Sequence, residues 1–303
     1  YRCLTLVQMA GVLVLAAGVE PAFNHDYVLL VFGYVVMRAA LVAQWLRASR
    51  SAGDLRRTTQ IYAAGVAGVQ ILWLLWLLTD GPVQVIGLIF LIFAELAVPV
   101  TAERNGTTPW HPHHITERYG LFTLILLGES LLASANAVIE ALHEEQGHEI
   151  ASLISLAILA FVVTAALWWI YFWPPHHEAI GSLRDSIQYG YLHYFVFAAA
   201  GAFSAGIEVE IDSMVGKSEL TEVQASFTYT IPIAVFVIGI WWIALRANAD
   251  RVVNTVVPMG ALLVLFDPII PVPVTLTAIL MVIIVAVLVV RPPISRSSGV
   301  AVH

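Results

Sequence analysis

The sequence predicts an all-α protein, a polytopic bundle of about ten transmembrane helices whose two ends both lie in the cytoplasm. Composition is the first reason: 59% of the 303 residues are hydrophobic and only 12% are charged, whereas a soluble domain carries about 25% charged residues. The second is that the apolar residues fall in runs of about 17–22, the length that a helix needs to cross the hydrocarbon core. The third is the segregation of positive charge to alternate loops.

The apolar runs predict one integral-membrane helical domain that occupies the whole chain. The last two runs are short or contain proline, so they can form one broken hairpin instead of two full crossings; these prolines are Pro258, Pro268, Pro271 and Pro273. The predicted spans are 3–19, 27–46, 60–78, 83–101, 116–138, 150–173, 188–207, 225–245, 252–266 and 272–290.

The positive-inside rule orients these spans. If the loop 47–59 is cytoplasmic, Lys217 is the one basic residue in an outer loop, and Arg38 lies inside a span. Such an asymmetry would be lost if one span were missed or invented, so it supports both the layout and the cytoplasmic location of the two ends. The basic residues on the cytoplasmic side are Arg2, Arg47, Arg50, Arg56, Arg57, Arg104, Arg118, Arg184, Arg246, Arg251, Arg291 and Arg296.

Several protein classes are excluded by what the chain lacks. Cys3 is its single cysteine, which excludes an intrachain disulfide and a cysteine-based zinc site. The sequence contains no phosphate-binding glycine loop, nucleotide fingerprint or nucleophile elbow. The basic loop between Arg47 and Arg57 fits contact with membrane lipids better than with nucleic acid. Small-residue faces such as 198–201 fit helix packing, either within one protomer or in a homo-oligomer.

Glu129 is the first candidate site residue, because it lies in the middle of an apolar span and a carboxylate at that depth is costly. Gly120 and Gly128 allow close helix packing, so we expect Glu129 to face the bundle interior as a proton carrier or ligand site, or as a structural carboxyl. Glu117 and Arg118 are expected in the first turn of the same helix, where a carboxylate also complements the helix dipole.

Arg38 and Glu95 are the other two charged residues that lie within spans. Their depths from the cytoplasmic side are similar, so we predict an ion pair between them, because buried charges need partners. The pair serves either function or helix packing.

His193 lies within the seventh span, where it can relay protons or hydrogen bond to a backbone carbonyl. Tyr189 and Gly201 mark the same helix as a close-packing surface.

Five histidines of the cytoplasmic loops form a second candidate set. Together with Glu117 and Glu178 they contain the ligand types that zinc, iron or manganese prefer, although their spacing matches no metal signature, so a solvated loop is the alternative. These histidines are His111, His113, His114, His176 and His177. Aromatic residues at the inner ends of two spans are interpreted as a membrane-interface belt, with ligand stacking as the alternative: Trp168, Trp169, Tyr171, Trp173, Trp241 and Trp242.

The stretch from Glu117 to Glu129 reads Glu-Arg-Tyr-Gly-Leu-Phe-Thr and runs into Leu-Gly-Glu. It resembles the hallmark of the bacterial low temperature requirement A family. Supporting similarities are a Tyr-x-x-x-Arg pattern that ends at Arg38, the Trp-Trp-Ile-Tyr-Phe stretch at 168–172, and a helix that carries His193 and an Ala-Gly-x-Glu stretch ending at Glu208. Family members begin with a Glu-x-Phe-Phe-Asp-Leu-type motif, so we expect further N-terminal helices before this chain.

Three functions are compatible with these residues. The first is a proton-linked transporter or channel for a small ion or molecule, with Glu129 as carrier and His193 or Glu117 as relay. The second is a membrane-embedded lipid-modifying enzyme with an interfacial His/Glu site, with or without metal. The third is a structural or sensory membrane protein linked to growth at low temperature. The family name describes a growth phenotype, so the resemblance does not choose among them.

Overall fold

The computed structural model describes the whole chain except residues 110, 144–149, 271, 273 and 295–303. The described residues form helices and connecting turns and contain no β-strand, which confirms the all-α prediction. The helices are α1 (Arg2–Ala17), α2 (Val19–Phe23), α3 (Val28–Ala48), η1 (Gly53–Leu55), α4 (Arg56–Trp76), α5 (Gly81–Glu103), α6 (Pro112–His143), α7 (Ile150–Phe172), η2 (His176–Ala179), α8 (Leu183–Met214), α9 (Glu222–Ile240), η3 (Trp241–Leu245), α10 (Val253–Leu263), η4 (Val264–Ile269) and α11 (Thr275–Val290).

Each of the ten predicted spans corresponds to a helical segment of the structure. Within the described residues, seven helices are long and apolar enough to cross a membrane. This confirms the predicted class, a multi-pass membrane protein, but not the number of ten spans. Three shorter apolar segments, Arg2–Ala17, Val253–Ile269 and Thr275–Val290, correspond to the first span and the last two. Full crossing by these three segments stays a prediction, as does the orientation of the ends. Arg296 lies outside the described residues.

Local sequence signals explain where several helices begin. Asp80 is extended at the start of α5 and is followed by a proline in the first turn, where a missing N–H does no harm. Thr221 begins α9 with a capping box, because its side chain accepts from the backbone of Gln224 and the Gln224 side chain accepts in return. Ser182 caps α8 by accepting from the backbone N–H of Asp185.

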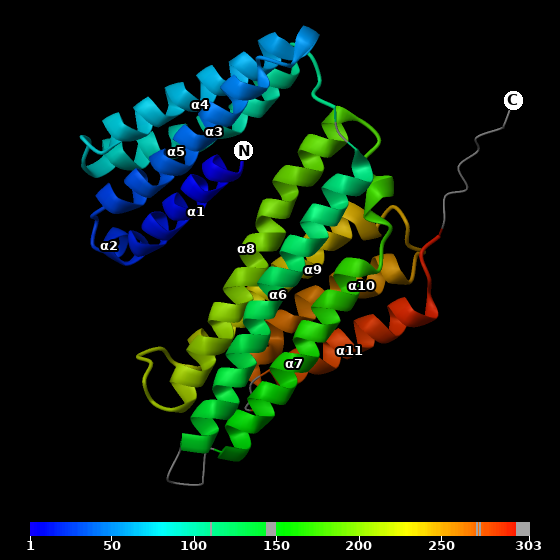
Figure 1. Cartoon of the computed structure of the whole chain (residues 1–303). Coiled ribbons are helices and arrows are strands. Elements are labelled where there is room, and N and C mark those ends of the chain that lie inside the picture. The colour runs from blue at the N-terminus through cyan, green and yellow to red at the C-terminus, as the bar shows by residue number, and fades with distance from the viewer. Residues whose placement is uncertain (110, 144–149, 271, 273, 295–303) are drawn as a thin grey trace, which may run out of the picture. The chain divides into compact units, whose positions relative to one another are not determined.

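The chain divides into two compact units, Tyr1–Pro109 and Trp110–His303. In the first unit, α3 packs between α1 and α4, and α4 in turn packs against α5 (Figure 1). The buried side chains of this unit form one small hydrophobic core, made of Val31, Val66, Val69, Trp76, Leu91 and Val98.

The helices α1 and α3 approach each other closely at two glycines. A Cβ atom added to Gly33 would overlap the backbone of Leu15, and one added to Gly18 would overlap the backbone of Leu30. Small residues permit this approach in a membrane helix pair, where packing rather than hydrophobic burial drives association. The two glycines therefore set the distance between α1 and α3.

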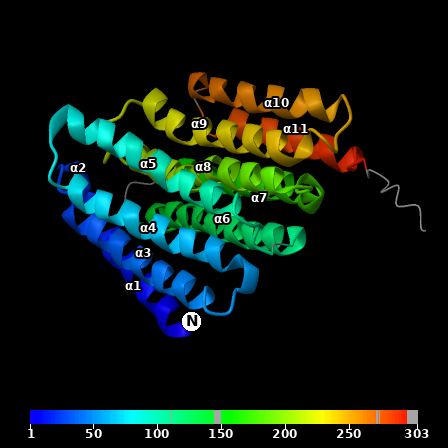
Figure 2. The ribbon, with the colours of Figure 1, turned by 90° about the horizontal axis from the view of Figure 1, so that it is seen from above.

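In the second unit, α8 is the central helix. It packs against α6 on one side and α9 on the other, while α7 packs against α6 and also contacts α11. Figure 2 shows α10 beside both α9 and α11 at the far edge of this unit. The large core includes fully buried aromatic side chains from three of these helices: Tyr171, Phe203, Tyr229 and Phe236.

The end of the chain is irregular, as its prolines predict. After a π-helical turn at η3, α10 contains Pro258, and Pro268 lies in the 3-10 turn η4. Pro271 and Pro273 lie outside the described residues. The buried Asp267 of η4 accepts hydrogen bonds from the backbone N–H groups of Val274 and Thr277, which begin α11.

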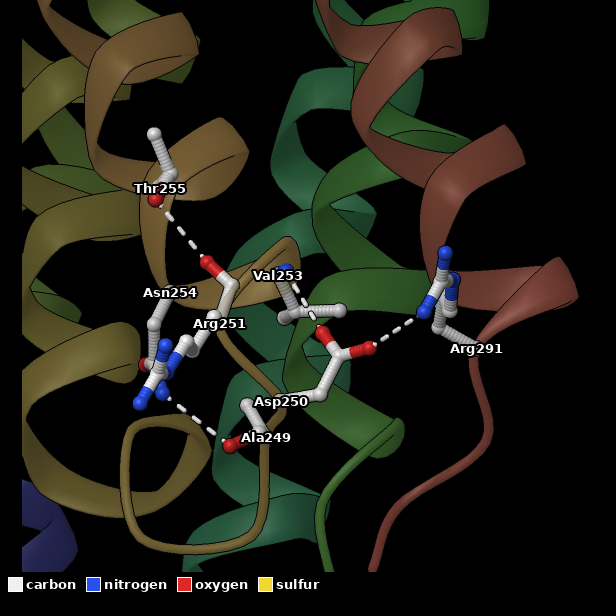
Figure 3. A network of polar contacts seen from close by, with 7 residues as sticks. All are labelled: Ala249, Asp250, Arg251, Val253, Asn254, Thr255 and Arg291. Atoms are coloured by element: carbon white, nitrogen blue, oxygen red, sulfur yellow. Dashed lines mark hydrogen bonds and ion pairs between the residues drawn. The ribbon is translucent and has the colours of Figure 1, made fainter.

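A polar network joins the start of α10 to the end of α11 (Figure 3). Asp250 accepts from the backbone N–H of Val253 through one oxygen and pairs with Arg291 at 2.7 Å through the other. The hydrogen bond from Val253, followed by the Arg291 interaction, lowers the pKa of Asp250. The pair lies at the protein surface, so its role is to position the two helix ends rather than to add much stability.

Candidate functional site

The structure brings His176 and His193, predicted separately, into one cluster. His176 belongs to η2 and His193 to α8, and the centroids of their rings are 6.1 Å apart. Both imidazoles are buried, His193 completely. A buried imidazole needs hydrogen-bond partners for both ring nitrogens, and two tyrosines supply them.

The two histidines and two tyrosines form a closed cycle of four hydrogen bonds. The Nε2 atom of His176 lies 2.6 Å from the carbonyl oxygen of Tyr171, and its Nδ1 lies 3.1 Å from the hydroxyl of Tyr189. The Nδ1 atom of His193 lies 2.8 Å from the carbonyl oxygen of Tyr189, and its Nε2 lies 3.3 Å from the hydroxyl of Tyr171. We refer to these four residues as the His–Tyr cycle.

The partners assign the proton positions within the His–Tyr cycle. A carbonyl oxygen only accepts, so Nε2 of His176 and Nδ1 of His193 each carry a proton. The other nitrogen of each neutral imidazole is then an acceptor, and the hydroxyls of Tyr189 and Tyr171 donate to them. Every bond in the cycle is therefore satisfied with both imidazoles neutral.

The local sequence explains how the cycle forms. Pro174 and Pro175 follow α7 and prevent it from continuing, because proline lacks an N–H and clashes with the preceding turn. The chain turns into η2, which returns His176 to the last turn of α7 and Tyr171. Tyr189 and His193 are four residues apart on α8 and therefore lie on one face of that helix.

Tyr119 on α6 completes the wall around the imidazoles. Its ring meets that of His193 edge-on, with centroids 4.9 Å apart, and lies 5.4 Å from that of Tyr189. Glycines make room here: a Cβ on Gly190 would lie 3.0 Å from the Tyr119 hydroxyl, and one on Gly120 would lie 3.2 Å from the ring of Phe172. Close packing at Gly120 was expected from the sequence, and the structure confirms it.

His176 lies between the spans, and its environment favours the neutral form. Burial lowers the pKa of His176 to about 4, an effect that exceeds the opposing hydrogen bond to the carbonyl of Tyr171. At neutral pH the imidazole is therefore uncharged, as the hydrogen-bond assignment requires.

A polar pocket of about 400 Å³ reaches the His–Tyr cycle at Tyr189. It opens between η2, the first turns of α8 and the turn η3. Charged side chains of both signs line it, namely Glu178, Asp185 and Arg246. The two imidazoles are thus buried, and Tyr189 is the member of the cycle that lines this polar pocket.

Glu129 does not lie where the sequence placed it. Its side chain is exposed on α6, on a face shared with exposed apolar residues such as Ile125 and Leu132. A Cβ on Gly128 would meet nothing within 4 Å. The prediction that Glu129 faces the interior of the bundle is therefore wrong within this unit, because Ser130 and Ser134 occupy the interior face instead.

Glu117 and Arg118 are also exposed. The helix α6 begins at Pro112, several residues earlier than expected, so Glu117 lies in its second turn and the predicted first-turn position is wrong. The Nδ1 atom of His114 lies 3.8 Å from the carboxylate of Glu117 on the helix surface.

The candidate metal ligands do not assemble. Three of them, His111, His113 and His114, are exposed at the start of α6, and the ring of His113 stacks on that of His177 at 4.3 Å. His176 points away into the His–Tyr cycle. Across the described part of the chain, no group of three or more His, Cys, Asp or Glu side chains is placed to hold a metal ion.

The predicted ion pair of the first unit is confirmed. A guanidinium nitrogen of Arg38 lies 2.9 Å from a carboxylate oxygen of Glu95. The other carboxylate oxygen accepts from Gln70 at 2.9 Å, and Arg38 also donates to the hydroxyl of Tyr34, four residues earlier on α3. These bonds join α3, α4 and α5 through polar groups in an apolar core.

Glu208 lies on α8 near its C-terminal end and accepts a hydrogen bond of 2.8 Å from the side chain of Asn136 on α6.

A model of the bacterial low temperature requirement A protein family matches residues 1–290 of the chain. The chain belongs to this family. Comparison with curated proteins found no match, and comparison with solved structures found none.

The residues of the low temperature requirement A stretch, 117–129, therefore lie on two different faces of α6. Tyr119 and Gly120 of this stretch face the interior, where they contact His193 and Phe172, whereas Glu117, Arg118 and Glu129 lie on the exposed face of α6. Membership and the apolar helices together identify a multi-pass membrane protein.

Sequence reasoning missed two residues of the His–Tyr cycle. The interfacial position predicted for Tyr171 is wrong, since this residue is fully buried and bonded to both histidines. For Tyr189 the sequence predicts only a role in helix packing. The available signals were the four-residue spacing from Tyr189 to His193 and the double proline that returns the chain to Tyr171.

Proposed function

We propose that this member of the low temperature requirement A family is a proton-linked transporter or channel for a small ion or molecule in the bacterial cytoplasmic membrane. In this proposal the His–Tyr cycle, and not Glu129, binds the proton. The observation that supports it best is a pair of buried neutral imidazoles, locked into defined tautomers, with one of their tyrosine partners lining a charged pocket.

Protonation would force the cycle to rearrange. A proton added to Nδ1 of His176 turns this acceptor into a second donor. The hydroxyl of Tyr189 can then no longer donate to it, and its O–H bond has to rotate so that the oxygen accepts instead. The same argument holds for His193 and Tyr171. Because these residues belong to α7, η2 and α8, a change of protonation acts on the packing of two long helices at once.

The pocket beside Tyr189 gives the proton a route. The carboxylates of Glu178 and Asp185 line this pocket beside Tyr189, whose hydroxyl bonds to His176, so polar groups extend from the pocket to the imidazole. The interior face of α6 continues away from the cycle with the buried hydroxyls of Thr123, Ser130 and Ser134. A proton-linked step would therefore use the seam between α6 and α8 rather than the exposed face that carries Glu129.

A structural or sensory membrane protein is the second candidate. The observation that favours it is that both nitrogens of each imidazole in the His–Tyr cycle are satisfied without any ligand. In this second role the network does no more than hold α7, η2 and α8 in register.

Dissipation of a pH gradient in proteoliposomes tests the proposal. Wild type would be compared with His193→Gln over a small panel of ions, with His25→Asn, an exposed histidine of the first unit, as the matched control. We expect proton flux from wild type and from the control, and its loss in His193→Gln protein that retains a monodisperse elution profile.

Two outcomes would overturn this assignment. Absence of flux from well-folded wild type with every ion would favour the structural or sensory candidate. Flux that persists in His193→Gln but disappears in Glu129→Gln would return the proton site to the exposed carboxylate of α6.

A further inference from the structure

A second pocket lies at the opposite end of α8 from the His–Tyr cycle. Tyr189 and Glu210 are separated by about 30 Å along the helix, at 1.5 Å per residue. This pocket has a volume of about 660 Å³ and lies between the first turns of α7 and α9, the last turns of α8, and η4. Its volume is in the range of small-molecule sites, which is about 300–1,000 Å³.

Glu210 lines this pocket and has an unsatisfied carboxylate oxygen. Only 2% of the residue is exposed, and its Oε2 atom has no hydrogen-bond partner among the residues that the structure describes. A buried carboxylate oxygen without a donor is costly, so it requires either a proton or a positively charged ligand.

The neighbouring Asp267 shows that the fold can satisfy a buried carboxylate fully. One of its oxygens accepts from the Tyr229 hydroxyl and the backbone of Val274, and the other accepts from the backbone of Thr277. Asp267 is thereby committed to the start of α11, whereas Glu210 faces the pocket with an open position. The contrast identifies Glu210 as the group available to a ligand.

The rest of the pocket fits a small amphipathic cation. Hydroxyls line it on several sides, the carboxylate of Glu222 lies at its exposed edge, and the described lining residues include no basic side chain. Apolar side chains complete the wall, among them Leu156, Val223 and Ile270. The hydroxyls come from Ser152, Ser155, Ser213 and Ser226.

We propose that this pocket binds a protonated organic amine, with the ammonium group on Glu210 and the serine hydroxyls and the apolar part against α7 and η4. A bare metal ion fits less well, because it needs several oxygen ligands within about 2–3 Å of one point, whereas this pocket has room for a molecule of several heavy atoms. The proposal concerns binding alone and does not depend on proton flux through the His–Tyr cycle.

Isothermal titration of the full chain in detergent tests the proposal with three probes. The probes are n-pentylammonium, the neutral n-pentanol of similar size, and sodium ion. We expect pentylammonium to bind in preference to both others, and its affinity to fall about tenfold or more in Glu210→Gln. The charge-matched control Glu219→Gln, an exposed residue outside the pocket lining, should keep wild-type affinity.

A second variant keeps the test decisive if Glu210→Gln folds poorly. Ser155→Leu leaves the carboxylate in place and fills part of the pocket, so it should also weaken pentylammonium binding. Pentanol binding as tightly as pentylammonium, a wild-type affinity in both pocket variants, or no binding of pentylammonium to wild type would each overturn the proposal. Preference for sodium would replace the organic cation with a metal ion.

Discussion

The hydroxyl of Tyr171 on α7 lies 3.3 Å from Nε2 of His193 on α8, while the backbone carbonyl of the same tyrosine accepts from His176. One residue thus joins α7, α8 and the turn η2. Tyr189 repeats the arrangement in the opposite sense, with its carbonyl bonded to His193 and its hydroxyl to His176. Two of the three bonds that join different segments of this junction use phenol oxygens, which leads to the first prediction.

Tyr171→Phe should destabilise the protein by about 1–3 kcal/mol, because it leaves Nε2 of His193 buried without a donor. Thermal unfolding in detergent, followed by circular dichroism, measures the change. Tyr194→Phe is the matched control, since Tyr194 lies on α8 with 70% of its surface exposed. Equal melting temperatures for the two variants would show that the bond to His193 adds nothing.

His176 should make stability depend on pH. Its pKa of about 4 in the folded protein is below the ordinary value of 6.5, so the unfolded chain binds more protons between these values. The neutral imidazole therefore contributes stability that is fully present above pH 6.5 and is lost as the pH falls toward 4, by about 3 kcal/mol.

Unfolding of wild type and His176→Gln across pH 4–7 measures this contribution. The variant should lose part of the slope that wild type shows in this window. His113→Gln removes an exposed histidine of the same unit and should keep the wild-type slope. A slope that is the same in wild type and His176→Gln would contradict the buried neutral state.

Gly206→Ala should be strongly destabilising, because its added methyl group would overlap the carbonyl oxygen of Thr228 on α9. Overpacking of this kind costs about 1–3 kcal/mol, and here the obstacle is backbone, which cannot rotate away. Gly201→Ala on the same helix meets nothing within 4 Å and should be neutral or slightly stabilising. A comparison of melting temperatures distinguishes the two, and similar losses in both would contradict the close approach of α8 and α9.

Arg38 and Glu95 should be energetically coupled. Each single substitution, Arg38→Met or Glu95→Gln, leaves the other charge in a partly buried site without its partner, so the double variant should lose less stability than the sum. A double-mutant cycle in detergent should give a coupling free energy of about 1–3 kcal/mol. Additive losses would mean that the pair contributes nothing beyond its separate contacts.

The similar depths of Arg38 and Glu95 could be predicted from the sequence, whereas the face of α6 that carries Glu129 could not. Arg38 and Glu95 were paired correctly because their depths matched. Glu129 lies in an apolar run, but lipid is as apolar as a protein core, so hydrophobicity does not distinguish the inner face of α6 from the outer one. The exposed face of α6 is in fact apolar, with Leu121, Ile125 and Leu132 beside Glu129.

The His–Tyr cycle could be predicted only in part, because its bonds depend on a turn rather than on helical spacing. The relation of Tyr189 to His193 follows from their four-residue separation. The approach of His176 to Tyr171 depends on how the chain leaves two successive prolines, which residue identity alone does not specify. Whether the carboxylate of Glu210 is paired likewise depends on tertiary contacts, because its possible donors lie on the helices packed against α8.

The glycine contact between α1 and α3 limits how the first unit can move. With the backbone of Leu15 lying against Gly33 and that of Leu30 against Gly18, the two helices interlock at two points. Sliding one helix along the other by a single turn would drive a side chain into backbone at both points. In any conformational cycle of this protein, α1 and α3 would have to travel as one rigid body, and flexing would be confined to their ends.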